Sequence, residues 1–221
     1  APASVGIPRQ TKVVFSHVAA ATVTGPVVNL VVALPAEAKP LRRHFVLERD
    51  QQAQLPLYRG EGMLLAVCGV GSKAAAQVVA RLAKSNRQSG QALWINMGIA
   101  GHPFRPVGEA VLAGEIRDQS TGEHWVTQLP PDPPCAVDRL MTLAKPDPAY
   151  RWQGLQDMEA TGFYASASAY AEAARVQCLK VVSDNLQQPA DGINGSMVSD
   201  LITSRLKILE HLIGQLQDSM P

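Results

Sequence analysis

Apolar residues gather in short continuous runs along the chain, and segments of helical character separate these runs. The first run, residues 27–34, is rich in β-branched side chains and ends at Pro35. A continuous run of this kind is typical of a strand that is buried on both faces of a sheet. The same criteria predict further strands over residues 63–68, 92–97, 107–116 and 178–182.

Helices are predicted over residues 36–45, 73–83, 160–174 and 197–216. In the last of these segments, apolar residues recur along one helical face. The alternation of strands and helices predicts a single-domain, layered α/β fold in which helices flank a central, mostly parallel but mixed sheet. A sheet of this kind binds its ligand at the carboxyl ends of its strands. Glu37, Gly69, Gly98 and Asp184 all lie at such ends and are therefore candidate site residues.

Two segments do not fit the alternation. Residues 1–25 contain scattered apolar residues broken by charged residues and proline, without the uninterrupted stretch of a signal peptide or membrane span. Residues 117–150 contain six prolines, which favour loops and edge structure. We therefore expect an N-terminal extension without a targeting role over residues 1–25 and one domain over residues 26–221.

The composition argues against several classes of partner. Of the 221 residues, 46% are hydrophobic, and 20 basic and 19 acidic residues are spread along the chain. This balance favours neither nucleic acid nor an anionic membrane, and a small neutral molecule is the better candidate. The three cysteines form no CxxC pair and no zinc-like spacing with histidine, so we expect no metal, no cofactor and a cytoplasmic location.

Six short motifs at the predicted strand ends resemble, in the same order, those of the nucleoside phosphorylase and nucleosidase superfamily. They lie at residues 33–37 (ALPAE), 67–71 (VCGVG), 96–101 (NMGIAG), 107–109 (VGE), 157–160 (DMEA) and 182–184 (VSD). The resemblance covers residues 27–216 and implies a phosphorylase/hydrolase-like fold. Within the superfamily the chain looks most similar to the hydrolytic branch, which includes methylthioadenosine/S-adenosylhomocysteine nucleosidase and futalosine hydrolase.

The resemblance implies a role for each matching residue. Asp184, in the pair Ser183-Asp184, would donate a proton to N7 of a purine, and Glu37 would take a proton from the attacking water. Glu159 would accept hydrogen bonds from the ribose hydroxyls, and Met158 would pack against the sugar. Helix-terminal or turn carboxylates are the alternative explanation for all three acids, because such residues are common at these positions.

Residues 96–99 bear on the choice between hydrolysis and phosphorolysis. Phosphorolysis requires a fixed dianion beside the sugar, usually held by arginine and hydroxyl donors. Where phosphorylases of the superfamily carry an Arg-x-Gly-Ser type motif, this chain has Asn96, Met97, Gly98 and Ile99. Ile99, in place of the serine of typical methylthioadenosine nucleosidases, increases the similarity to futalosine hydrolase.

Glycines 69 and 98 would form a wall against the base or sugar, through positive φ or close backbone approach.

The sequence thus predicts an enzyme that hydrolyses the N-glycosidic bond of a purine nucleoside, with a 5′-substituted adenosine as the expected substrate. Two alternatives stay open: a phosphate-dependent purine nucleoside phosphorylase, and a catalytically silent nucleoside-binding relative. The resemblance also implies a homo-oligomer, most simply a dimer, and apolar helix faces would permit one.

Overall fold

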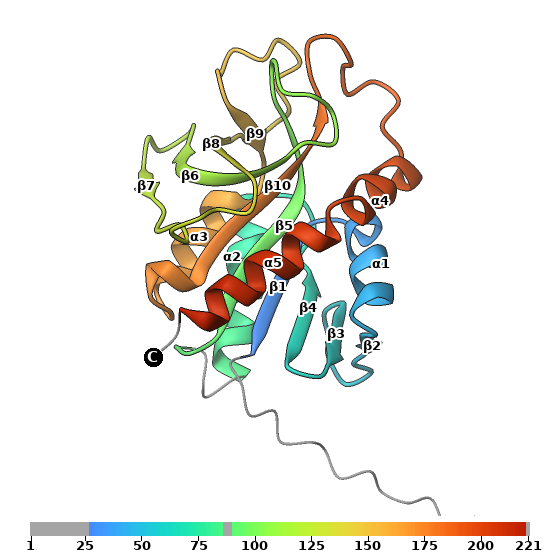
Figure 1. Cartoon of the computed structure of the whole chain (residues 1–221), viewed down its shortest axis with the longest axis vertical. Coiled ribbons are helices and arrows are strands. Elements are labelled where there is room, and N and C mark those ends of the chain that lie inside the picture. Colours follow the sequence, from blue (N-terminus) through green and yellow to red (C-terminus); the bar gives the residue numbers. More distant parts are fainter. Residues whose placement is uncertain (1–26, 86–89, 220–221) are drawn as a thin grey trace, which may run out of the picture.

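The computed structural model describes residues 27–85 and 90–219, which form a single-domain mixed α/β fold (Figure 1). The expected N-terminal extension over residues 1–25 lies outside the described residues. None of the helices in the described ranges is long and apolar enough to cross a membrane.

The part of the chain that the structure describes contains ten strands and five α-helices. The strands are β1 (Val28–Val32), β2 (Glu48–Arg49), β3 (Leu57–Gly60), β4 (Met63–Val67), β5 (Leu93–Gly101), β6 (Ala110–Asp118), β7 (His124–Val126), β8 (Ala136–Thr142), β9 (Leu155–Asp157) and β10 (Val176–Asp184). The helices are α1 (Pro35–His44), α2 (Ser72–Ser85), α3 (Ala160–Ser168), α4 (Gly195–Thr203) and α5 (Leu206–Asp218), with a short 3₁₀ helix at Ala173–Arg175.

The sheet has a parallel centre and a part that closes on itself. β4, β1, β5 and β10 are parallel neighbours in that order. β10 then pairs antiparallel with β6, β6 and β8 pair in parallel, β8 and β9 pair in parallel, and β9 returns to β5. Five strands therefore close a ring beside the open parallel part. The mostly parallel, mixed sheet expected from the sequence is confirmed.

Two hydrophobic cores lie on opposite faces of this sheet. Successive residues of one strand divide between them, as the alternation of side chains along a strand requires. Val31 of β1 packs in the core under α2 and α3, whereas Leu30 and Val32 pack in the core under α1, α4 and α5. Figure 1 shows α5 crossing the face on which α1 and α4 also lie. This double covering explains why the central strands are mainly apolar on both faces.

Four predicted elements differ from the structure. The helix expected over 197–216 is divided between α4 and α5, and the helix expected over 160–174 ends at Ser168. Residues 117–150 contain β7 and β8, and β8 lies between β6 and β9 instead of at an edge. β5 continues through Gly98 as far as Gly101, so its glycines lie within the strand and not in a turn after it.

Candidate active site

A cavity of about 300 Å³ opens at the carboxyl ends of β1, β5 and β10. Its volume is at the lower end of the range for small-molecule sites. Six of the eight predicted site residues line it: Glu37, Ile99, Met158, Glu159, Ser183 and Asp184. Gly69 and Gly98 are not among the lining residues. The tertiary structure therefore brings together the three acids that the sequence singled out, which are up to 147 positions apart in the chain (184 − 37).

Glu37 is buried near the start of α1, where its carboxylate accepts three backbone hydrogen bonds. Oε2 accepts from the N–H groups of Ala33 (2.9 Å) and Leu34 (2.8 Å), and Oε1 accepts from Ile99 N–H (2.9 Å). Burial raises the pKa of Glu37, and these donors together with Lys180 oppose the rise. A carboxylate oxygen can accept two hydrogen bonds, so Oε1 retains a lone pair. Glu37 thus both caps a helix and presents an acceptor at the cavity.

Gly98 of β5 approaches the Glu37 side chain closely. A Cβ atom at this position would lie 2.8 Å from Oε1 of Glu37, so only glycine lets the strand approach the carboxylate. Gly98 is absent from the residues with positive φ, whereas Gly69 has a φ of 82°. The two positions thus require glycine for different physical reasons. Gly98 allows a close approach to Glu37, and Gly69 adopts a left-handed conformation in the turn after β4.

Gly98→Ala tests this packing. We expect the variant to lose about 1–3 kcal/mol of unfolding free energy, because the added methyl group must displace a buried carboxylate that three N–H groups hold. Gly214→Ala is the matched control, since its Cβ would meet nothing within 4 Å in the middle of α5. The control should gain about 0.5–1 kcal/mol through the helix preference for alanine. Equal denaturant midpoints for the two variants would contradict the close approach.

Glu159 follows β9 and is also buried. Its Oε1 accepts a hydrogen bond from Gly71 N–H (2.9 Å), in the turn between β4 and α2. Burial, and then the neighbouring carboxylate of Asp157, raise the pKa of Glu159 to about 7, against the opposing effect of Lys180. Met158 precedes it and is half-buried at the cavity wall. This pair offers an anionic acceptor beside an apolar surface.

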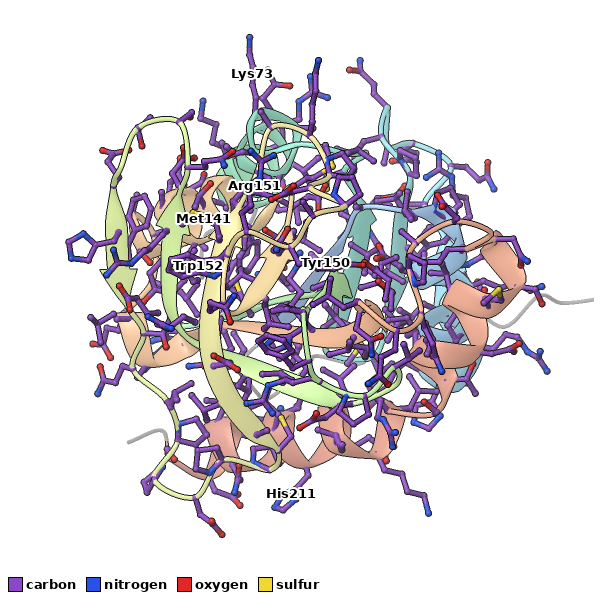
Figure 2. The ribbon with its side chains drawn as sticks, turned by 90° about the horizontal axis from the view of Figure 1, so that it is seen from above. Lys73, Met141, Tyr150, Arg151, Trp152 and His211 are labelled. Atoms are coloured by element: carbon purple, nitrogen blue, oxygen red, sulfur yellow. The ribbon has the colours of Figure 1, made fainter. Side chains whose placement is uncertain are left out.

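Asp184 ends β10, and two hydroxyl groups contact its carboxylate. Ser183 Oγ donates to Oδ1, and the phenol of Tyr150 donates to Oδ2 at 2.5 Å. Tyr150 lies near the centre of the molecule in Figure 2, next to Arg151 and Trp152, whereas Lys73 and His211 lie at opposite margins of that view. The burial of Tyr150 and its contact with Asp184 both raise the pKa of the phenol, so it acts as a hydroxyl and not as an anion.

Sequence reasoning missed Tyr150 and Lys180. Tyr150 comes from the proline-rich segment, which carried no motif. Lys180 interrupts the apolar strand β10, and a cation within a buried strand is a signal that it has a buried partner. Its Nζ lies 2.8 Å from Oδ2 of Asp157 and 2.7 Å from Oδ1 of Asn96.

The charge of the cavity wall has one sign. Six acidic residues line the cavity: Glu37, Asp147, Asp157, Glu159, Asp184 and Asp191. No lysine or arginine is among the described residues that line it. Apolar side chains from two loops, among them Leu143, Pro146 and Ile193, form the rest of the wall. Burial raises the pKa of the Cys68 thiol to about 12, so the thiol is neutral, and Cys68 is not among the residues that line the cavity. The described residues contain no group of three His, Cys, Asp or Glu side chains arranged to hold a metal ion.

Known structures share this architecture. The 5′-methylthioadenosine nucleosidase of Arabidopsis thaliana, solved in its apo form, is 17% identical over 88% of this chain and 97% of its own, with a TM-score of 0.73. A methylthioadenosine/S-adenosylhomocysteine nucleosidase of Colwellia psychrerythraea, solved with adenine, is 15% identical over 89% and 98%, with a TM-score of 0.69. Futalosine hydrolase of Helicobacter pylori is 9% identical over 86% and 98%, with a TM-score of 0.68.

The sequence matches no family model and no curated protein. The likeness therefore rests on the course of the backbone over nearly the whole length of both chains. The chain shares the fold of these nucleosidase and futalosine hydrolase structures.

Proposed function

We propose that this chain is a nucleosidase that hydrolyses the N-glycosidic bond of a purine nucleoside, with a 5′-substituted adenosine as substrate. The observation that carries the proposal is the meeting of Glu37, Glu159 and Asp184 at one cavity. The proteins of similar structure are named as nucleosidases and a futalosine hydrolase, which supports hydrolysis of an N-glycosidic bond.

Each acid has a separate task in the proposed reaction. Glu37 removes a proton from a water molecule, whose oxygen attacks C1′ of the sugar. The C1′–N9 bond breaks as Asp184 donates a proton to N7, so the base leaves as a neutral molecule. Glu159 binds the ribose hydroxyls, and its negative charge favours the cationic sugar of the transition state over the neutral ground state.

The charge of the cavity favours water over phosphate as the nucleophile. A phosphate dianion beside the sugar needs cationic donors, and the described cavity wall offers six acidic residues and no lysine or arginine. Like charges would raise the free energy of the bound dianion. This distribution supports hydrolysis over the phosphorylase alternative.

A panel of 5′-substituted adenosines, incubated with and without phosphate, tests the reaction. Chromatography follows the products. We expect free adenine and free sugar in phosphate-free buffer, and added phosphate should not increase the rate of base release. A sugar 1-phosphate product with an absolute phosphate requirement would overturn the hydrolase proposal. Nucleoside binding in calorimetry without release of base would favour the catalytically silent relative.

We further propose a homodimer in the cytoplasm. Val70, Leu186 and Met197 are large apolar residues with roughly half of their surface exposed, as at the faces of many oligomers. All three cysteines are free thiols, which fits a reducing compartment. Light scattering after size-exclusion chromatography measures the assembly, and a monomer mass at micromolar concentration would contradict the dimer.

A further inference from the structure

Lys180 is a charged residue at the centre of the fold whose role the proposed reaction does not yet explain. Its side chain is 1% exposed and lies in β10, between apolar neighbours in the strand. Both of its close partners come from other strands: Asp157 at the end of β9 and Asn96 in β5. Burying an ammonium group in an apolar core is costly unless it is paired, so the ion pair with Asp157 holds this cation in place.

The pair includes a residue of the candidate active site. Asp157 is two residues before Glu159, and both residues are among those that line the cavity. The charged or titratable groups that act on Glu159 come from four elements: Asp157 of β9, Lys180 of β10, Glu37 of α1, and Cys68 at the end of β4. Two of these are acids, and the thiol is neutral. Lys180 is thus the one cation in this described set.

The carboxylates of Asp157 and Glu159 differ in the number of hydrogen-bond donors other than Lys180 that contact them. Asp157 accepts hydrogen bonds from Thr142 Oγ1 (2.8 Å) and from Ala160 N–H (2.9 Å). Glu159 accepts one backbone hydrogen bond, from Gly71. Apart from Lys180, Asp157 thus has two hydrogen-bond donors, whereas Glu159 has one.

We infer that Lys180 is a positioning residue for catalysis: paired with Asp157 and Asn96, it keeps Glu159 ionised at the sugar side of the cavity. This inference rests on the proposed function, in which Glu159 must be negatively charged to stabilise a cationic sugar. A neutral Glu159 would still offer a hydrogen bond to a ribose hydroxyl, but it would lose the electrostatic preference for the transition state.

The ionisation of Glu159 can be measured without any substrate. Glutamate labelled with ¹³C at the carboxyl carbon gives one signal per residue, and the signal missing in Glu159→Gln identifies Glu159. In the parent we expect a titration midpoint near pH 7. In Lys180→Met the midpoint should rise by about one unit, because an opposite charge has been removed. Lys180→Arg, which keeps the cation, should titrate close to the parent.

A second pair of variants keeps the test decisive if Lys180→Met does not fold. Asp157→Asn removes the acid whose charge raises the pKa of Glu159 most and should lower the Glu159 midpoint. Lys180→Met combined with Asp157→Asn buries no unpaired charge, and its midpoint should lie above that of Asp157→Asn alone. Cys178→Ala, a neutral change in the same buried strand, is the control and should leave the midpoint unchanged.

Activity gives an independent reading. The acidic limb of the pH profile of kcat/KM should move to higher pH in Lys180→Met by about the shift that the Glu159 signal shows, and Lys180→Arg should restore it. A lower rate with unchanged midpoints would reduce Lys180 to a packing residue and overturn the inference. The Glu159 midpoints of the variants could move as expected although the parent protein releases no base. That result would uphold the electrostatic role of Lys180 and refute the nucleosidase proposal.

Discussion

Asp184→Asn is expected to lower the rate of base release by about 10²–10⁴-fold, the usual effect of removing a general acid. The amide cannot donate a proton to the leaving base, and the charge that builds on the purine is left without neutralisation. Steady-state kinetics with the best substrate of the panel measure the loss, and the effect should appear in kcat more than in KM.

This substitution should disturb the fold little. Both partners of Asp184, Ser183 and Tyr150, are hydroxyl groups, which can accept as well as donate a hydrogen bond. One of them can reverse its role toward the new amide NH₂ group, so we expect a stability change of about 1 kcal/mol or less. Asp200→Asn, an exposed residue of α4, is the control. Parental activity in Asp184→Asn would remove Asp184 from the mechanism.

Glu37→Gln is expected to lower turnover strongly while nucleoside binding survives. Deprotonating water is separable from holding the base or the ribose, so its loss should lower the single-turnover rate by about 10²–10⁴-fold without a comparable loss of affinity. Titration calorimetry and rapid-quench measurements on the same preparation separate the two quantities.

Unlike Asp184, Glu37 has backbone partners that cannot reverse. Ala33, Leu34 and Ile99 all offer N–H groups, and the NH₂ group of glutamine must face at least one of these donors. We therefore expect Glu37→Gln to cost about 1–3 kcal/mol of stability, measured by denaturant unfolding. Glu61→Gln, at an exposed turn, is the control. Parental cleavage rates would leave Glu37 as a helix cap only, and a variant unable to bind would place it in direct contact with the ligand.

The position of the acids was predictable because parallel strands end at a common edge. Glu37 and Asp184 follow runs that predict buried strands, and Glu159 falls within a motif of the same series. Once the sheet is parallel, such ends must converge. The sequence also predicted that helices cover the sheet, because helix-forming composition and apolar periodicity are local information, although two of the predicted helices have other bounds in the structure.

Other features depended on contacts between distant residues. α4 and α5 share one apolar periodicity, and no proline or glycine marks the break between them. The chain leaves the helix at Arg205, whose guanidinium donates to the carbonyl oxygen of Gly108. Such a contact, between residues 97 positions apart, has no local signature.

The sequence by itself therefore determined the class of fold and the residues at the strand ends. Only the tertiary structure decided how those residues are tuned. The close approach of Gly98 to Glu37, the Tyr150 hydroxyl on Asp184 and the Lys180–Asp157 pair each join different elements. Burial and charge at a site are sums over all neighbours in space, whereas hydrophobic periodicity is carried by neighbours in the chain.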